Sequence, residues 1–185
     1  RPSGYADIHI GYAGLGAGLV QTIDHGALRT VVDYDAMLRP VLEERRPLSD
    51  GGGLIFTRFE YDALGRRTFE SFPAATANPA AGMATTYDGL GRVIRTEETV
   101  SPYAATVTAY LSGNREQVTD AAGHVTTTWR SGWGGPDDGA PVRIDHPLGL
   151  TTEMTYTDWG GLLTARQSGS HGGYSVLETQ FWNYD

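Results

Sequence analysis

The sequence contains no cysteine and no lysine, and it has no long hydrophobic run. The lack of cysteine excludes disulfides and thiolate metal sites, and it leaves the redox compartment open. No stretch approaches the roughly 18 apolar residues of a membrane-spanning helix. Because lysine is absent, every basic side chain apart from histidine is an arginine. Two explanations fit this: a GC-rich genome, or selection against lysine in a protein delivered into a host cell, where lysines are ubiquitination targets.

Positive charge is also scarce, since the formal net charge is −8. A nucleic-acid partner needs a basic face for its phosphates, so the charge argues against one, and also against an electrostatic membrane anchor. No signal peptide and no initiator methionine are present. The chain opens on Arg1-Pro2 and closes on Asn183-Tyr184-Asp185. We therefore expect residues 1–185 to form a single segment of a larger protein.

Helix-forming runs of alanine, leucine and glutamate are missing as well. Only Pro40–Arg46 has the composition of a short helix, which Pro47 would end. What the sequence does contain is glycine, at 25 residues, together with many threonines and tyrosines. This mixture favours short strands joined by tight turns, and so an all-β fold.

An internal repeat organises these strands. Two hexapeptides 26 residues apart are nearly identical, Tyr61-Asp62-Ala63-Leu64-Gly65-Arg66 and Tyr87-Asp88-Gly89-Leu90-Gly91-Arg92. Degenerate copies begin at positions 12, 34, 119, 144, 156 and 184, and most steps between copies fall in the range typical of repeat proteins. The motif residues of the degenerate copies are Tyr34, Asp35, Asp120, Gly123, Asp145, Gly149, Tyr156 and Gly160. In the copy at 34 a leucine, Leu38, replaces the glycine, and in the copy at 156 the aspartate is displaced to Asp158.

Each copy of the hexapeptide predicts one β-hairpin. The tyrosine ends a strand, and the aspartate opens a turn in which its carboxylate accepts a hydrogen bond from the backbone N–H two residues on. The next two residues only need turn conformations, so their identity should matter little. The glycine supplies a positive φ, and the arginine starts the returning strand, as in a type I turn closed by a glycine bulge.

The flanking segments alternate between two faces, as strands do. The alternation is visible in 58–61, 67–72, 125–130 and 154–157. Successive hairpins would lie side by side, with a ladder of tyrosines over which arginines lie, unless they pair with the turn aspartates. Three Gly- and Pro-rich stretches predict longer loops, near 73–83, 132–141 and 168–174.

The tandem set of Tyr-Asp-x-x-Gly-Arg motifs with Thr- and Tyr-rich flanks resembles the YD (RHS-type) repeat, over about residues 12–185. This repeat occurs in bacterial RHS proteins, in the B and C components of insecticidal toxin complexes, in wall-associated proteins and in teneurins. The resemblance implies tandem antiparallel β-hairpins in a curved, twisted ribbon or partial shell. In the bacterial members the shell encloses a toxic C-terminal domain, and an aspartyl autoprotease motif, which has no evident match here, releases it.

The resemblance therefore implies a structural role in a bacterial protein that is secreted or lies at the cell surface. The expected partners are the remainder of the parent shell and its toxin cargo, with self-association through the open sheet edges. A sheet residue covers roughly 16 Å², so the whole chain tiles only about 3,000 Å². That area is too small to enclose a toxin of about 100 residues, whose radius of gyration is about 13 Å. We therefore expect the chain either to be part of a wall or to assemble with other copies.

No residue pattern points to catalysis, a cofactor or a metal. The five histidines lack metal-ligand spacing, and Asp137-Asp138-Gly139 lacks the spaced acids of a calcium loop. Gly14–Gly18 lacks the following helix of a phosphate loop, and we expect a hairpin turn there. The main alternative function is a carbohydrate- or protein-binding surface built from exposed aromatics. Trp133, in a Gly-rich loop, is the best glycan-binding candidate, and a small enzyme ranks third.

Overall fold

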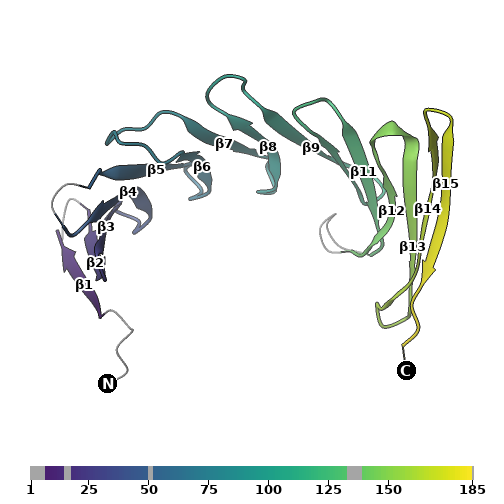
Figure 1. Cartoon of the computed structure of the whole chain (residues 1–185), viewed down its shortest axis with the longest axis horizontal. Helices are drawn as coiled ribbons and strands as arrows, with labels where there is room; N and C mark the ends of the chain where they lie inside the picture. The colour runs from purple at the N-terminus through teal and green to yellow at the C-terminus, as the bar shows by residue number, and fades with distance from the viewer. Residues whose placement is uncertain (1–6, 15–17, 50–51, 133–138, 185) are drawn as a thin grey trace. The chain divides into compact units, whose positions relative to one another are not determined.

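The computed structural model describes residues 7–14, 18–49, 52–132 and 139–184 (Figure 1). Fifteen strands are hydrogen-bonded in sequence order as one antiparallel sheet, so the prediction of an all-β fold built from tandem hairpins is confirmed. One 3₁₀ turn, η1 (Pro147–Gly149), interrupts the strands. The contacts divide the chain into two compact units, Arg1–Arg92 with Thr96–Ala104 and Val93–Arg95 with Ala105–Asp185, described in turn below.

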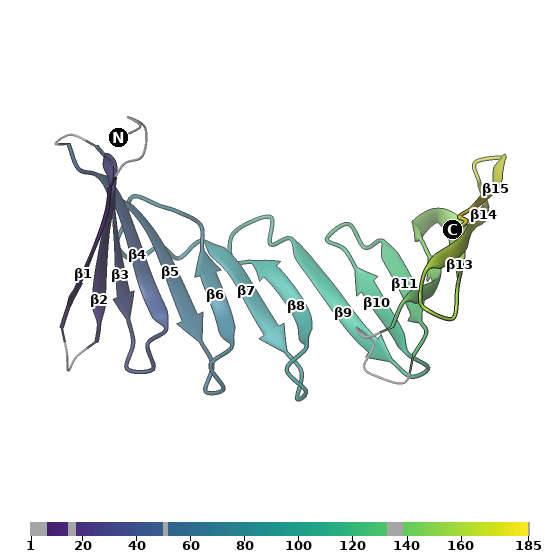
Figure 2. The ribbon, with the colours of Figure 1, turned by 90° about the horizontal axis from the view of Figure 1, so that it is seen from below.

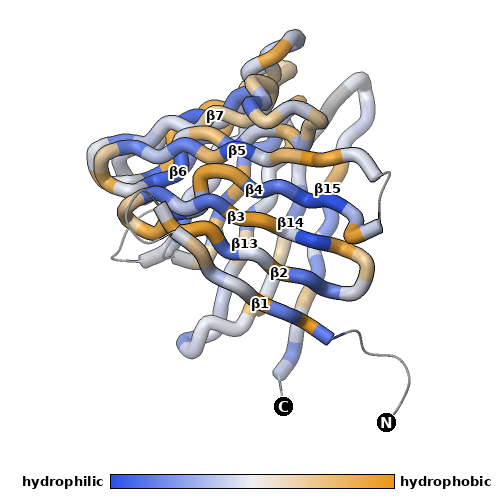
Figure 3. The backbone as a smooth tube through the Cα atoms, turned by 90° about the vertical axis from the view of Figure 1, so that its left-hand side faces the viewer, coloured by the Kyte–Doolittle hydropathy of each residue, from blue (hydrophilic) through white to orange (hydrophobic). Residues whose placement is uncertain are grey.

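The first unit is an antiparallel meander. Adjacent strands pair antiparallel, and in β3–β4 and in β5–β6 the register shifts by one residue beside the turn. Such a shift is the bulge expected from the turn motif. Polar and apolar residues are interspersed along these strands (Figure 3). The strands are β1 (Ile8–Ala13), β2 (Val20–His25), β3 (Leu28–Tyr34), β4 (Pro40–Pro47), β5 (Ile55–Tyr61), β6 (Arg67–Ser71), β7 (Gly82–Tyr87) and the end of β8 (Val93–Glu98).

A small core forms where the predicted loop 73–83 folds back on this meander. Phe56 and Phe69 are both 7% exposed, and Pro79 from the loop is buried against the same region. Ala74 pairs with Phe56 as an isolated bridge, and the hydroxyl of Ser71, itself 2% exposed, accepts a 2.7 Å hydrogen bond from the backbone N–H of Arg58. Few other side chains are buried, because a single sheet layer has two exposed faces. Stability must therefore be summed over many repeated contacts.

The second unit continues in the same style. It contains the start of β8 and then seven strands, and the turns between consecutive antiparallel strands alternate between the two edges of the sheet (Figure 2). The longest paired segment is β14–β15, with register from Thr164↔Phe181 to His171↔Tyr174. The strands are β9 (Ala105–Leu111), β10 (Arg115–Thr119), β11 (Val125–Arg130), β12 (Pro141–Asp145), β13 (Leu150–Tyr156), β14 (Leu162–His171) and β15 (Tyr174–Phe181).

Two local predictions are wrong. The stretch 40–46 is not helical but lies in β4, because its residues pair with β3 on one side and β5 on the other, and tertiary pairing overrides a weak helix propensity. The stretch 168–174 is not a long loop. It forms the ends of β14 and β15 around a tight turn in which Gly172 and Gly173 both have positive φ, which is the glycine-rich turn that a two-residue hairpin needs.

Candidate functional site

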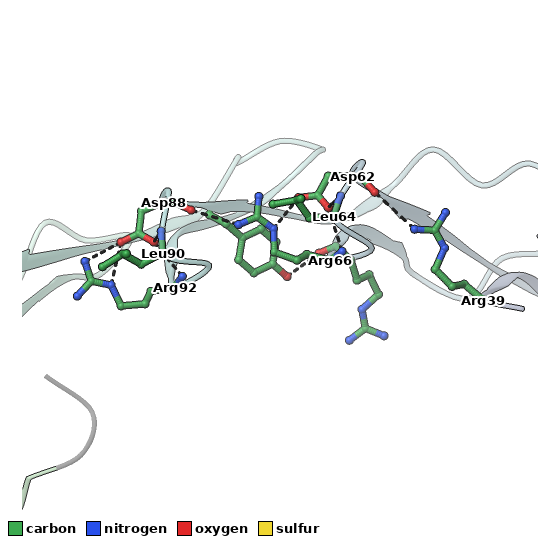
Figure 4. A network of polar contacts seen from close by, with 9 residues as sticks. Arg39, Asp62, Leu64, Arg66, Asp88, Leu90 and Arg92 are labelled. Carbon is green, nitrogen blue, oxygen red and sulfur yellow. Dashed lines mark hydrogen bonds and ion pairs between the residues drawn. The ribbon is translucent and has the colours of Figure 1, made fainter. Parts of the chain in front are cut away.

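The turn aspartate organises its own turn. In the turns that follow Tyr34, Tyr61 and Tyr87, one carboxylate oxygen accepts the backbone N–H groups of the second and the fourth following residues, at 2.9–3.0 Å. The first of these is the hydrogen bond that the sequence predicts. The other carboxylate oxygen accepts the Nε of the arginine at the end of the turn, at 2.6–2.8 Å. One aspartate thus satisfies two backbone donors and one guanidinium (Figure 4).

The turn tip lies two residues after the aspartate position, and the residue after the tip has a positive φ in the six copies whose turns the structure describes. Gly65, Gly91, Gly123, Gly149 and Gly160 have φ between +80° and +86°. In the turn of Asp35 this position is Leu38, with a φ of +59°. The backbone therefore keeps the same left-handed conformation even where the sequence does not provide a glycine, and it carries steric strain there.

Two turn arginines, Arg39 and Arg66, each connect two successive hairpins. Arg39 pairs with Asp35 of its own turn, its guanidinium lies 4.6 Å from the ring centroid of Tyr61, and its Nη1 donates to the carbonyl of Asp62. Arg66 repeats the arrangement one hairpin later, 4.7 Å from the Tyr87 ring and 3.1 Å from the Asp88 carbonyl. The sequence presented stacking and ion pairing as alternatives, whereas the structure shows both at once. The arginine is therefore the residue that locks one hairpin to the next (Figure 4).

Each turn tyrosine makes a second link between hairpins. Its hydroxyl donates to the carbonyl of the first residue after the preceding turn on the same edge. The hydrogen bonds are Tyr61 to Pro40 at 2.9 Å, Tyr87 to Arg67 at 2.7 Å, Tyr156 to Pro141 at 2.6 Å and Tyr184 to Leu162 at 3.0 Å. We refer to this contact as the tyrosine lock. At the start of the chain, Gln21 bridges the hydroxyls of Tyr12 and Tyr34 instead.

One tyrosine lock was missed in the sequence. Tyr110 donates to the carbonyl of Val93 at 3.3 Å, although its turn, Ser112-Gly113-Asn114, carries no hexapeptide. The available signal was spacing, because Tyr110 lies one two-strand step after Tyr87. The lock thus depends on the strand pairing and does not require the motif that follows it.

Two motif positions are shifted from their predicted residues. At the copy of Asp145, the turn's aspartate position is held by His146, whose N–H donates to the carbonyl of Leu150. Asp145 lies one residue earlier, in β12, where it pairs with Arg143 and accepts the hydroxyl of Thr151. His146 Nε2 contacts the buried hydroxyl of Thr152 at 2.9 Å.

At the copy of Tyr156, the aspartate was expected to be displaced to Asp158. The structure places Thr157 in the aspartate position instead. Its hydroxyl accepts the N–H of Gly161 at 2.8 Å, and its own N–H donates to the Gly161 carbonyl. A hydroxyl performs the carboxylate's backbone role because both are short side-chain acceptors. Asp158 is therefore not needed to close this turn.

The copies also differ in the edge on which they lie. Within the second unit, the Asp120 and His146 turns follow β10 and β12, whereas the Tyr110 and Tyr156 turns follow β9 and β13 and lie on the opposite edge. Asp120 keeps the local turn bonds, to the N–H groups of Ala122 and His124. Thr119 stands before it in place of a tyrosine, so the side chain that forms the lock is missing. The repeat is therefore one local turn used on both edges, with the lock on one.

The turn contacts lower the pKa of the aspartates. At Asp35 the guanidinium of Arg39 is the main cause, and at Asp88 and Asp120 the main cause is the backbone N–H four residues on. At Asp62 desolvation raises the pKa, but the backbone and side-chain donors of Arg66 together outweigh it. Desolvation raises the pKa of the hydroxyls of Tyr61 and Tyr156. These shifts come from structural contacts, so the aspartates are held ionised as hydrogen-bond acceptors.

The other candidates do not converge on a chemical site. Trp133, the predicted glycan-binding residue, lies outside the described residues, as do Asp137 and Asp138. In the described ranges no group of three or more His, Asp or Glu side chains is placed to hold a metal ion. Likewise, no helix in the part of the chain that the structure describes is long and apolar enough to cross a membrane. A hollow of about 300 Å³ beside η1 is lined by Pro147, Leu148, Leu150, Gly169, Ser170, Tyr174 and Val176.

Comparisons with known proteins add little to this geometry. No family model matches the sequence, and no curated protein matches it. Among solved structures, a porin-like protein from Bacteroides uniformis ATCC 8492 aligns with a TM-score of 0.42 and 12% sequence identity, over 92% of this chain and 91% of that one. A likeness this distant carries no argument about the function of this chain.

Proposed function

We propose that this chain is a structural wall segment of an RHS-type β-shell that encapsulates a C-terminal toxin, in a secreted or surface bacterial protein. The observation that carries the proposal is the double link between successive hairpins of the first unit, in which an arginine and a tyrosine connect one hairpin to the next. Such links extend a sheet by addition of identical units, which is what a wall requires. In the part of the chain that the structure describes, the aspartates, arginines and tyrosines of these turns contact one another and the backbone.

The proposed partners are the rest of the parent shell, its toxin cargo and other sheet edges. The two outermost strands, β1 and β15, expose their side chains along their whole length. An exposed strand edge with large apolar residues, such as Ile8, Ile10 and Leu177, is a template for another strand. The edges therefore favour continuation of the sheet by further strands.

The parent gene and its product test the wall proposal. We expect further Tyr-Asp-x-x-Gly-Arg motifs on both sides of this segment and an unrelated C-terminal domain. In the full-length protein, limited proteolysis should leave that C-terminal domain intact while the same domain expressed alone is digested. A parent gene without further motifs, or a C-terminal domain cut equally fast in both forms, would overturn the proposal.

A second candidate function is a binding surface for glycans or proteins, since several aromatic side chains are exposed. Trp159, at a turn tip, is 79% exposed, and Tyr174 is 82% exposed. Exposed aromatic rings offer apolar faces on which sugar rings stack. A glycan array tests this candidate: binding that is lost in Trp159→Ala or Trp133→Ala supports it, and an array without any bound glycan overturns it.

A further inference from the structure

Two arginines stand directly opposite each other in the first unit. Arg29 of β3 and Arg46 of β4 are cross-strand partners, so their side chains lie on the same face of the sheet. Like charges in this arrangement repel one another and destabilise a sheet. In the second unit, by contrast, Glu153 stands between Arg143 and Arg166, so the charges alternate in sign. The arginine pair breaks a rule of strand pairing, as residues at functional sites do.

A carboxylate orients each of the two guanidinium groups. Asp24 of β2, the other cross-strand neighbour of Arg29, accepts hydrogen bonds from its Nε and Nη2, both at 2.7 Å. Glu44 lies two residues before Arg46 on the same face, with its Oε1 3.3 Å from the Arg46 Nε. Within the described residues, the Nη1 of Arg29 and both terminal nitrogens of Arg46 donate no hydrogen bond. These donors are available to a ligand.

Both arginines line a hollow of about 400 Å³, which also borders the connection between β4 and β5. Leu48 holds the start of this connection, because its N–H donates to the carbonyl of Ala27 at 2.8 Å. Gly52 approaches the end of β4 so closely that an added Cβ would lie 2.0 Å from the Cγ of Pro47. Only a glycine allows this approach. The wall of the hollow is therefore held by close contacts at two points.

The rest of the lining combines apolar side chains with one hydroxyl. Pro47, Leu48 and Leu54 line the hollow, and Ser49 lies beside them. Leu48 is 44% exposed and Leu54 is 39% exposed, so both can be covered further by a ligand. The volume lies within the range of small-molecule sites, which combine apolar walls with a few polar groups. The lining thus offers guanidinium donors for a charged group and apolar side chains for a carbon body.

We propose that this hollow binds a small organic carboxylate between Arg29 and Arg46. The two oxygens of a carboxylate match the paired donors of a guanidinium, and an anion between the two arginines offsets their repulsion. Asp24 and Glu44 already place two negative charges beside the arginines, so a monoanion is accepted more readily than a phosphate dianion. The arginine side chains are 34% and 44% exposed, so we expect weak binding, with a Kd on the order of 1 mM.

Ligand-observed NMR titration of the whole chain tests the inference. The probes are hexanoate and glucuronate, which carry the same carboxylate on an alkyl body and on a sugar body. Hexanamide and glucose are their neutral counterparts. We expect at least one carboxylate to bind and both neutral compounds to fail. Tighter binding of hexanoate assigns the apolar wall to an alkyl body, and tighter binding of glucuronate assigns it to a sugar.

Substitutions of neighbouring arginines locate the binding. Arg46→Gln removes charge-assisted hydrogen bonds, so it should weaken binding of the better probe by about tenfold or more. Arg45→Gln is the matched control, because Arg45 points to the opposite face of β4 and pairs with Glu43 there, and its affinity should equal that of the wild type. If circular dichroism shows that Arg46→Gln does not fold, Arg46→Lys replaces it, keeping the charge but losing the paired donors.

Three results would overturn the inference. They are an absence of binding by both carboxylates, equal losses of affinity in Arg46→Gln and Arg45→Gln, and inorganic phosphate binding more tightly than either carboxylate. The inference goes beyond the wall role and does not depend on it. The wall proposal would stand after any of these results, since its own test is the parent gene and the protection of the C-terminal domain.

Discussion

Leu38 occupies the turn position that Gly65 and Gly91 hold in the next two turns, and it adopts the same positive φ. A leucine in this region suffers a clash between its Cβ and the backbone, at a cost of about 1–2 kcal/mol. Glycine removes the clash but loses more backbone entropy on folding, about 0.5–1 kcal/mol. Leu38→Gly should therefore stabilise the protein by about 0.5 kcal/mol.

Urea denaturation followed by circular dichroism measures this difference. Leu64→Gly is the matched control, since Leu64 is similarly exposed and has no positive φ. There the glycine brings only the entropic cost, so we expect a loss of about 0.5 kcal/mol. Equal effects of the two substitutions would contradict the role of backbone strain at Leu38.

Gly82 is the glycine with the tightest surroundings in the first unit's core. A Cβ added there would lie 2.2 Å from the carbonyl oxygen of Glu70 and 2.5 Å from the Cα of Ser71. Gly82→Ala must push β6 and β7 apart, and overpacking of this kind costs about 1–3 kcal/mol. A lowered urea midpoint is the expected result. Gly89→Ala, where an added Cβ meets open space, should stay within about 0.5 kcal/mol of the wild type.

At the residue scale, the sequence predicts what depends on a few neighbouring positions. The aspartate-to-N–H bond at Asp62 and the positive φ at Gly65 follow from the hexapeptide alone. The roles of Thr157 and His146 do not, because several short polar side chains can hold the aspartate position and only the backbone register shows which one does. The clash at Gly82 is likewise invisible in the sequence, since it comes from a strand 11 residues earlier.

At the scale of the hairpin, the tyrosine lock is the contact whose removal is most informative. Tyr87→Phe keeps the ring under Arg66 and removes only the hydroxyl that donates to the Arg67 carbonyl at 2.7 Å. A hydrogen bond of this kind contributes about 0.5–1.5 kcal/mol, so we expect a loss of about 1 kcal/mol in urea denaturation. Tyr174→Phe, at an 82% exposed side chain, is the control and should change little.

Tyr87→Leu extends the test to the ring. It removes both the lock and the surface on which the Arg66 guanidinium lies, so it should destabilise more than Tyr87→Phe by about 0.5–1 kcal/mol. Equal losses for the phenylalanine and leucine variants would show that the ring adds nothing. The sequence predicts the strands and the tyrosine ladder, but the acceptor of each hydroxyl depends on which residue the neighbouring strand places opposite it.

At the scale of the whole chain, the uneven repeat steps have a topological cause. An antiparallel meander returns to the same edge after every second strand. The steps of 26 and 27 residues contain two strands, whereas the 32-residue step from 87 to 119 contains three and the 12-residue step from 144 to 156 contains one. The sequence shows the unequal steps, but counting strands inside them requires the hairpin at Ser112-Gly113-Asn114, which has no hexapeptide to mark it.

Acid is the condition that acts on every aspartate turn at once. The carboxyl groups of Asp35, Asp62, Asp88 and Asp120 have folded-state pKa values below the unfolded value of about 3.9. Between the two values the unfolded chain binds more protons, so stability rises with pH. The stabilisation is fully present above the unfolded value and is lost as the pH falls through the folded values. We therefore expect thermal stability to hold above about pH 5 and to fall steeply below about pH 4.

Asp62→Asn combined with Asp88→Asn identifies the groups responsible. The asparagines still accept backbone N–H groups but no longer titrate or pair as anions with Arg66 and Arg92. The double variant should have a lower melting temperature than the wild type at pH 7. Its melting temperature should fall less between pH 5 and pH 2, so the melting temperatures of the two proteins should become equal in acid. If the melting temperature of the double variant depended on pH as that of the wild type does, carboxyl groups other than Asp62 and Asp88 would control acid unfolding.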